Sequence, residues 1–236
     1  MSIILDRPAV RIDVDGRAEP KTLLDLPALT LAEHRIGVIG ANGSGKSTLL
    51  RLLNGLVLPT AGRVTVGGLD TGKEVRAVRR RVGFVFTDPL SQLVMPTPRE
   101  DVELSLRRLV RNGVERRARA EAVLDRFGLL GMADQSVYEL SGGERQLAAL
   151  AAVLAVEPEI LVLDEPSTLL DLRNRELLRT TLAGLGQQVV LSTHDLEIAA
   201  DMDRVLVIDA GTVVFDGAAP EAVACYRALC GMPARP

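Results

Sequence analysis

The sequence predicts an α/β fold, with a core of parallel strands that is interrupted by a largely helical segment. A short apolar strand at Arg35–Ile39 is followed at once by a glycine-rich turn and then by apolar residues at helical spacing. Strand and helix patterns alternate again from Ile160 onward. Between these regions, from about Asp88 to Leu140, the chain is rich in Arg, Glu and Leu, as helices are. Such alternation is how a parallel sheet with helices on its faces is built.

The remaining elements follow in order along the chain. Two short β-like stretches separated by polar turns precede the first strand, at Val10–Val14 and Ala28–Leu31. A helix is expected at Ser47–Leu58, ending near Asn54-Gly55 and Pro59. Further strands are expected at Gly62–Val66, Val82–Phe86, Ile160–Leu163, Val189–Leu191 and Val205–Ile208.

Composition excludes several classes of protein. The chain has 236 residues, of which 47% are hydrophobic, enough for a sizeable core. Its 28 basic and 31 acidic residues argue against a nucleic-acid binder, which usually carries a basic excess. The longest apolar run, Leu147–Val156, is too short to span a bilayer, which takes roughly 18–20 residues, and predicts a buried helix instead. With no export signal and only Cys225 and Cys230 as thiols, we expect a reduced, cytoplasmic protein.

A phosphate-binding motif lies between the strand at Arg35–Ile39 and the following helix. It matches G-x-x-x-x-G-K-[ST], and its residues with the one that follows are Gly40, Ala41, Asn42, Gly43, Ser44, Gly45, Lys46, Ser47 and Thr48. The glycines let backbone N–H groups converge on an anion, and the helix N-terminus adds its dipole. Lys46 can reach the β- and γ-phosphates, and the Ser47 hydroxyl can bind Mg²⁺. The motif predicts a nucleoside triphosphate site without identifying which class of NTPase it serves.

Two carboxylates follow the predicted strand at Ile160–Leu163. Asp164 ends this apolar strand, whose end lies beside the phosphate-binding turn in a parallel sheet, so that it can hold Mg²⁺ through water. Glu165 comes next and can polarise an attacking water as a general base. An acidic turn at a strand end without catalytic function is the alternative that this pair alone leaves open.

The segment Leu140–Gln146 decides between the NTPase classes. Its Leu-Ser-Gly-Gly-Glu-Arg-Gln sequence resembles the LSGGQ-type signature of the ABC (ATP-binding cassette) ATPases. The anion-binding positions are Ser141, Gly142, Gly143 and Glu144. A helix N-terminus with Ser141 and Glu144 as a capping box explains the same residues and is compatible with anion binding. The resemblance implies that this segment meets the γ-phosphate held by a second subunit.

Other positions of the ABC family occur in order from about Arg35 to Asp216. Ser167–Asp171 resembles the D-loop, and Ser192–Asp195 resembles the H-loop, whose His194 contacts the γ-phosphate in that family. The only other histidine, His34, has no predicted role. The resemblance implies a P-loop NTPase core of parallel strands with an N-terminal antiparallel β subdomain. It assigns residues 1–87 and 160–236 to this core and residues 88–159 to an inserted α-helical subdomain.

Two family features are missing. No aromatic residue precedes Phe84, although the family commonly stacks one on the adenine, so Arg11 or Arg17 is a candidate replacement. Thr87 occupies the position of a glutamine that contacts Mg²⁺ and the attacking water, and a threonine hydroxyl is a shorter ligand. Gln92 follows in a V-F-x-x-P-x-x-Q arrangement that resembles the ATPases of energy-coupling factor (ECF) importers, where this segment moves with the nucleotide cycle; a simple connecting loop is the alternative.

The resemblance implies ATP and Mg²⁺ as cofactors and a homodimer, or a paired cassette, that hydrolyses ATP. Its implied partners are an integral-membrane coupling protein and a substrate-binding membrane protein, with the chain on the cytoplasmic face of the inner membrane. Thr87 and a chain that ends about 42 residues past His194 favour biotin as the substrate, with a cobalt or nickel ECF importer as the alternative. Another ABC transporter, a soluble ABC protein of translation or DNA repair, and a non-hydrolytic module are the remaining alternatives.

A docking groove for a membrane partner is expected in the helical segment. Glu100–Arg111 is amphipathic, and the apolar residues expected to line the groove are Val102, Leu106, Leu109, Leu124, Phe127, Leu129, Leu130 and Met132. The alternative is that these side chains form the core of the segment itself.

Overall fold

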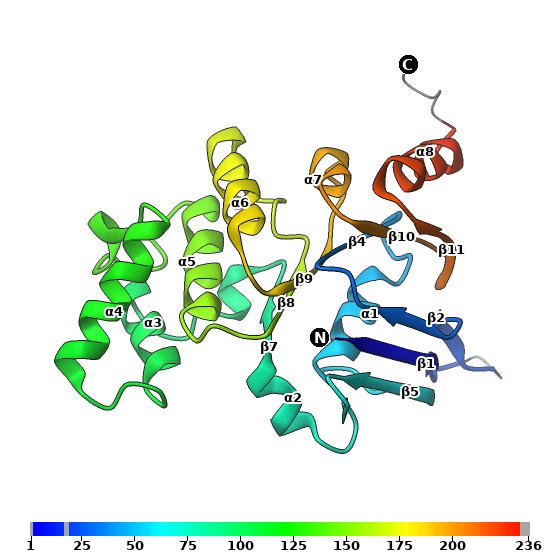
Figure 1. The fold of residues 1–236 in the computed structure, drawn as a ribbon, viewed down its shortest axis with the longest axis horizontal. Helices are drawn as coiled ribbons and strands as arrows, with labels where there is room; N and C mark the ends of the chain where they lie inside the picture. Colours follow the sequence, from blue (N-terminus) through cyan, green and yellow to red (C-terminus); the bar gives the residue numbers. More distant parts are fainter. Residues whose placement is uncertain (1, 17–18, 232–236) are drawn as a thin grey trace. The chain divides into compact units, whose positions relative to one another are not determined.

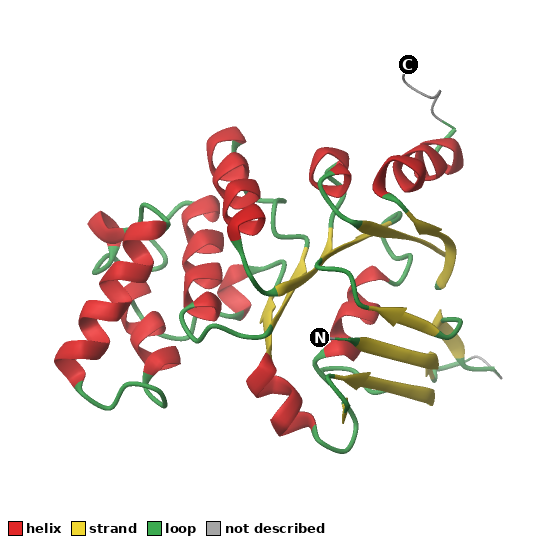
Figure 2. Ribbon diagram, in the orientation of Figure 1, coloured by secondary structure: helices red, strands yellow, loops and turns green. Residues whose placement is uncertain are grey.

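The computed structural model describes residues 2–16 and 19–231 and divides into two compact units. The first unit consists of Met1–Val82, Glu159–Glu165 and Gln187–Pro236, and the second of Gly83–Pro158 and Pro166–Gly186 (Figure 1). Figure 2 shows that strands dominate the first unit and helices the second. In the described ranges, none of the helices has both the length and the apolar character that crossing a membrane requires.

The first unit contains an antiparallel sheet. Its strands are β1 (Ile3–Ile12), β2 (Lys21–Asp25), β3 (Leu29–Leu31), β5 (Ala61–Val66) and β6 (Leu69–Asp70). The order is β2-β1-β5-β6, and β3 also pairs with β1. The side chains of Ile3, Leu5 and Leu24 in this sheet are fully buried. The N-terminal antiparallel β subdomain that the sequence implied is therefore confirmed.

A second sheet of the first unit supplies the parallel core. Its strands are β4 (Arg35–Ile39), β8 (Ile160–Asp164), β9 (Gln188–Ser192), β10 (Arg204–Asp209) and β11 (Thr212–Gly217), in the order β11-β10-β4-β9-β8. Pairing is parallel throughout except between β10 and β11. Every residue of β8 and β9 is buried, as expected for strands covered on both faces. The strands predicted from Arg35, Ile160, Val189 and Val205 are confirmed.

Helix α1 (Lys46–Leu53) packs against β8 and β9, and its four leucines are fully buried. Gly55, with φ of 66°, stops it, and the Arg79 guanidinium donates to the free carbonyls of Asn54 and Gly55. The other helices of the unit are α2 (Val75–Arg81), α7 (Leu196–Ala200) and α8 (Ala219–Leu229). The leucine-rich helix expected after Lys46 is confirmed, although it ends earlier than Leu58.

The second unit is mostly helical. After β7 (Val82–Val85), which begins at the last residue of the preceding unit, come the short 3₁₀ turns Pro89–Ser91 and Leu130–Met132 and helices α3 (Pro98–Leu106), α4 (Gly113–Arg126), α5 (Gly142–Leu154) and α6 (Leu172–Gly184). Each of these α-helices is preceded by a polar N-cap residue whose side chain accepts a backbone N–H, namely Thr97, Asn112, Ser141 and Asp171. The buried helix predicted from the run Leu147–Val156 is confirmed as part of α5.

Three sequence expectations need correction. The N-terminal strand runs over Ile3–Ile12 rather than Val10–Val14, and β2 was not expected because its two apolar residues are adjacent and do not alternate. Helix α3 stops at Leu106, because the chain turns over the next residues. Most of the apolar side chains expected to line a groove are instead buried in the core of the second unit: Val102, Leu106, Leu124, Phe127 and Leu129.

Candidate active site

The loop between β4 and α1 curls around the amino group of Lys46. Lys46 Nζ donates to the carbonyl oxygens of Gly40 and Ala41 at 2.9 and 3.1 Å, and the side chain is only 5% exposed. A Cβ at Gly40 would lie 2.1 Å from the Ile208 carbonyl oxygen, so only glycine fits there. Gly45, with φ of 112°, precedes the helix and provides no side-chain cap. The N–H groups at the start of α1 can therefore serve an anion.

Burial lowers the pKa of Lys46, and the nearby charges of Glu165 and Asp164 oppose this shift. The loop also holds the buried Ser44 hydroxyl, which has no hydrogen-bond partner among the described residues. A cation and an unused hydroxyl in one curled loop are suited to bind phosphate oxygens.

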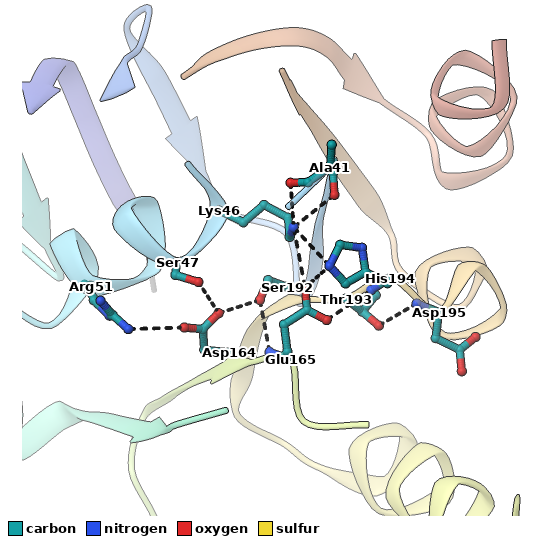
Figure 3. Close-up of polar contacts among 11 residues, drawn as sticks. Ala41, Lys46, Ser47, Arg51, Asp164, Glu165, Ser192, Thr193, His194 and Asp195 are labelled. Atoms are coloured by element: carbon teal, nitrogen blue, oxygen red, sulfur yellow. Dashed lines mark hydrogen bonds and ion pairs between the residues drawn. The ribbon is translucent and has the colours of Figure 1, made fainter. Parts of the chain in front are cut away.

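Asp164 lies at the end of β8 and is almost completely buried. Its Oδ1 accepts hydrogen bonds from Ser47 Oγ at 2.8 Å and from Ser192 Oγ at 2.9 Å (Figure 3). Its Oδ2 lies 4.0 Å from Nη2 of Arg51. The strand and the first turn of α1 thus bring one carboxylate and one hydroxyl oxygen together.

Glu165 follows Asp164 with an unusual backbone. Its φ of 52° lies in the left-handed region, which non-glycine residues rarely adopt. Its N–H donates to both the hydroxyl and the carbonyl oxygen of Ser192, at 3.0 and 3.2 Å. Its carboxylate Oε1 lies 3.5 Å from Lys46 Nζ. The turn therefore points this carboxylate toward the lysine.

His194 lies on the loop after β9, and its imidazole is 42% exposed. Its Nε2 is 3.0 Å from Glu165 Oε1 and 3.4 Å from Lys46 Nζ. Asp195 holds the loop by capping α7, and its own N–H donates to Thr193 Oγ1. Figure 3 shows the lysine at the start of α1 converging with the glutamate and the histidine, which follow β8 and β9. The other histidine, His34, lies at the surface beside Arg35.

The structure thus brings together Lys46, Ser47, Asp164, Glu165 and His194, five residues that were selected from the sequence. Ser192 and Arg51 complete the cluster, and sequence reasoning gave neither a role. The signal for Ser192 was its place as a polar residue at the carboxyl end of a buried parallel strand.

The oxygen atoms of Ser47 and Asp164 are the hard ligands that Mg²⁺ prefers. Within residues 2–16 and 19–231, no group of three or more His, Cys, Asp or Glu side chains is placed to hold a metal ion. A Mg²⁺ at Ser47 and Asp164 would therefore take its remaining ligands from phosphate and water, as this ion commonly does. The residues present fit that mode of binding.

The other predicted site residues belong to the second unit. Ser141 Oγ accepts the N–H of Glu144 at 3.2 Å and Glu144 Oε2 accepts that of Ser141 at 2.7 Å, which confirms the capping box. The adjacent Gly142 and Gly143 open helix α5, and a Cβ at Gly143 would lie 3.1 Å from Asn174 Nδ2. The first two residues of α5 are therefore glycines, so no side chain at these positions covers the helix N-terminus.

Thr87 follows a backbone that two glutamines fix within the second unit. Gln92 Oε1 accepts the N–H of Phe86 at 3.1 Å, and its Nε2 donates to the Ala149 carbonyl at 3.3 Å. Gln146 Nε2 donates to the Phe86 carbonyl at 3.3 Å. Gln92 thus links the loop to α5 by hydrogen bonds within the second unit.

Comparison with known proteins identifies the family. Residues 28–168 match the family described as ABC transporter. The biotin transport ATP-binding protein BioM of Rhizobium etli is 47% identical over 229 residues, covering 97% of this chain and 99% of its own. The Rhodobacter capsulatus BioM is 39% identical over 88% of each chain, and the cobalt import ATP-binding protein CbiO of that organism is 42% identical over 84% of this chain and 74% of its own.

Solved structures agree with this assignment. The ATP-binding cassette MJ0796, in a dimeric post-hydrolysis state bound to ADP and Pi, has a TM-score of 0.82 and 30% identity over 92% of this chain and 98% of its own. CbiO1 of Clostridium perfringens has a TM-score of 0.79 and 27% identity over 97% and 93%. The resemblance inferred from Leu140–Gln146 is confirmed. The chain belongs to the ABC transporter family and is an ATP-hydrolysing, ATP-binding subunit of such a transporter.

Proposed function

We propose that this chain powers the import of biotin as the ATPase subunit of an ECF transporter. The observation that carries the proposal is the 47% identity, over nearly the whole of both chains, to the biotin transport ATP-binding protein of Rhizobium etli. The V-F-x-x-P-x-x-Q arrangement ending at Gln92 supports the ECF class. Cobalt import is the second candidate, because the cobalt import relative is 42% identical to this chain. It ranks below biotin, because the match covers only 74% of that relative's length.

The segment Gly40–Thr48, which is the loop after β4 and the first turn of α1, binds the phosphates of ATP in this proposal. Lys46 exchanges its present partners, two loop carbonyls and the Glu165 carboxylate, for the β- and γ-phosphates. Its burial strengthens that exchange, because a buried cation without water gains most from a strong anion. The N–H groups at the start of α1 complete the binding of phosphate oxygens.

Ser47 and Asp164 hold Mg²⁺, with Thr87 as an additional ligand from the second unit. When bound, the ion neutralises charge on the phosphates as the transferred phosphoryl group leaves. Ser47 Oγ and Asp164 Oδ1 are already 2.8 Å apart, so these two ligands need little rearrangement. The guanidinium of Arg51 lies 4.0 Å from Oδ2 and adds a positive charge beside this carboxylate.

Glu165 is the general base, and His194 contacts the γ-phosphate. Both Glu165 oxygens face His194: Oε2 accepts its backbone N–H, and Oε1 lies beside its imidazole. Once Lys46 and His194 turn to the γ-phosphate, Glu165 Oε1 is available to orient a water and accept its proton. The reaction consumes that water and ATP and gives ADP and phosphate.

Two copies of the chain share each ATP in the proposed dimer. Ser141, Gly142, Gly143 and Glu144 of one copy present the N-terminus of α5 to the γ-phosphate held by the other copy. The related cassette MJ0796 is dimeric in a post-hydrolysis state bound to ADP and Pi, which supports a dimer for this chain. Residues 88–159 then act as a helical subdomain that carries this anion site, and residues 1–87 and 160–236 act as the nucleotide-binding core.

A groove in the second unit is the proposed docking site for a short helix of a membrane coupling protein. It has a volume of about 260 Å³ and lies between β7, α3 and the end of α5. Its apolar lining includes Phe84, Leu93, Val94, Leu104 and Val156. Val94 is 71% exposed although it is apolar, which is expected of a residue that a partner covers. The chain then sits on the cytoplasmic face of the inner membrane.

Co-purification tests this proposal. The tagged chain, extracted from membranes in mild detergent, should bring with it a coupling protein and a small membrane protein that binds biotin. Val94→Asp should abolish this capture, because a charge in the apolar groove is costly to bury. Val114→Asp is the matched control, since Val114 is 82% exposed but does not line the groove. Capture of a conventional permease pair would refute the ECF class, and a cobalt-binding partner would refute biotin.

A further inference from the structure

We propose that Ser192 is a positioning residue that fixes both carboxylates of the site through one hydroxyl group. Asp164 is held for Mg²⁺ and Glu165 is held for the attacking water, so the inference rests on the roles proposed above for these two residues. Ser192 opens the segment that resembles the H-loop, but that resemblance gives a role to His194 and none to Ser192.

The hydroxyl of Ser192 is a bridge. It donates to Asp164 Oδ1 at 2.9 Å and accepts the N–H of Glu165 at 3.0 Å. Ser192 is 0% exposed, so water does not replace either bond. The parallel pairing of β8 with β9 places Asp164 opposite Ser192, which sets the bridge by strand register. The carboxylate of Asp164 and the backbone N–H of Glu165 thus share one anchor on the neighbouring strand.

The bridge matters for Glu165 because the backbone there is strained. A φ of 52° is rarely adopted by a residue with a side chain, so the surrounding bonds must hold it. Among the described residues, the Glu165 N–H donates to Ser192 alone, to its hydroxyl and to its carbonyl oxygen. Loss of the hydroxyl leaves the weaker, longer bond at 3.2 Å. The direction of the Glu165 carboxylate then becomes less defined.

The bridge matters for Asp164 because its other side-chain donor has a second task. Ser47 Oγ also donates to Oδ1, but it is the proposed Mg²⁺ ligand. When Ser47 turns its oxygen to a cation, Ser192 remains to orient the carboxylate, while Arg51 lies 4.0 Å from the other oxygen. Hydrogen bonds of this kind to a metal-binding carboxylate are commonly worth about 10-fold or more in metal affinity or rate.

The test compares Ser192→Ala with the full-length wild-type chain. Binding of a fluorescent ATP analogue is titrated first without Mg²⁺ and then with increasing Mg²⁺, and kcat is measured separately. We expect the affinity for the ATP analogue without Mg²⁺ to be unchanged. The Mg²⁺ concentration that gives half of the Mg²⁺-dependent increase in affinity should rise about 10-fold, and kcat should fall about 10-fold. Unchanged Mg²⁺-free binding also shows that the variant is folded.

Two further variants control the result. Thr71→Val removes another fully buried hydroxyl of the same unit, one without a hydrogen-bond partner among the described residues, and should leave both quantities unchanged. Ser192→Thr keeps the hydroxyl and should recover most of the Mg²⁺ response.

The inference would be overturned if Ser192→Ala had the Mg²⁺ dependence and kcat of the wild type. It would also be overturned if Ser192→Ala failed to bind the ATP analogue without Mg²⁺, because the hydroxyl would then support the phosphate-binding loop instead. Glu165→Gln separates this failure from that of the proposed function. If Glu165→Gln is inactive while Ser192→Ala is normal, only the inference fails; if Glu165→Gln hydrolyses ATP normally, the proposed catalytic roles fail.

Discussion

The imidazole Nε2 of His194 lies 3.0 Å from Glu165 Oε1, and the backbone N–H of His194 donates to the other oxygen of the same carboxylate at 3.2 Å. One short loop after β9 therefore faces both oxygens of Glu165. The position of the proposed general base depends on this loop, which a bound γ-phosphate would contact through the imidazole.

Replacing Glu165 by Gln should leave ATP binding intact and slow hydrolysis. The amide has nearly the same shape but cannot accept the proton of the attacking water, and such a loss commonly costs about 100- to 10,000-fold in rate. Phosphate release measures the rate, and a fluorescent ATP analogue measures binding. Hydrolysis within about threefold of the wild type would contradict the general-base role.

Replacing His194 by Ala should lower kcat by about 100-fold, a typical loss for one group that stabilises transition-state charge. His34→Ala is the matched control, because His34 lies at the surface beside Arg35, outside the site. The two purified variants are compared for kcat and for ATP affinity. Equal activity of both variants would remove His194 from the mechanism.

The chain should bind ATP and GTP with similar affinity. No aromatic residue precedes Phe84, so stacking on the base, typically worth about 1–3 kcal/mol, is missing. Arg11 is the described candidate for a replacement, but its guanidinium forms an ion pair with Asp25 at 3.2 Å; Arg17 lies outside the described residues. Competition binding should give affinities within about threefold, whereas an ATP preference above about 10-fold would show that another group recognises the base.

Arg204 should stabilise the first unit. Its guanidinium binds both oxygens of Asp216 at 2.6 and 2.7 Å, both oxygens of Glu33 at 3.1 Å, and the Thr30 carbonyl at 2.8 Å. Arg204→Ala should lower the free energy of unfolding by about 1.5–3 kcal/mol, measured by urea denaturation. The ion pair of the exposed Arg63 with Asp70 is the control, and Arg63→Ala should cost less than about 1 kcal/mol. Equal effects of the two substitutions would contradict this account.

The contribution of this cluster should depend on pH. Burial alone would raise the pKa of Glu33, but hydrogen bonds from the backbone N–H groups of Glu33 and Ala32 and from Arg204 lower it overall, below 4.5. The unfolded chain therefore binds more protons near that pH, and stability is present above it and lost as the pH falls. The difference in free energy of unfolding between the wild type and Arg204→Ala should shrink as the pH is lowered below about 4.5. A difference that grows as the pH falls would contradict the lowered pKa of Glu33.

The sequence predicted those parts of the site that depend on contiguous residues. Lys46 and Ser47 follow from a glycine turn between a strand and a helix, whose geometry is local. Asp164 follows from an apolar strand that ends in a polar residue. His194 follows from the resemblance of Ser192–Asp195 to the H-loop of the family. Ser192 was missed as a functional residue because its contacts arise from the pairing of β8 with β9, which are distant in the sequence.

The same distinction, between local sequence patterns and contacts made by distant segments, explains the errors in the predicted fold. The core strands β4, β8, β9 and β10 are continuous apolar runs and were predicted nearly to the residue. Strand β2 is partly exposed at the edge of a sheet and has no alternating pattern. The apolar residues of the helical segment were assigned to a groove. Periodicity alone does not distinguish a helix face that packs within its own unit from a face that binds another protein.

Uptake of labelled biotin tests the central claim most directly. Cells that lack this chain receive either the wild-type chain or Glu165→Gln, and uptake of biotin and of cobalt is measured side by side. We predict that only the wild-type chain restores biotin uptake and that cobalt uptake is the same in all strains. Biotin uptake that is independent of the chain, or restored equally by Glu165→Gln, would contradict the claim that ATP hydrolysis by this subunit powers biotin import.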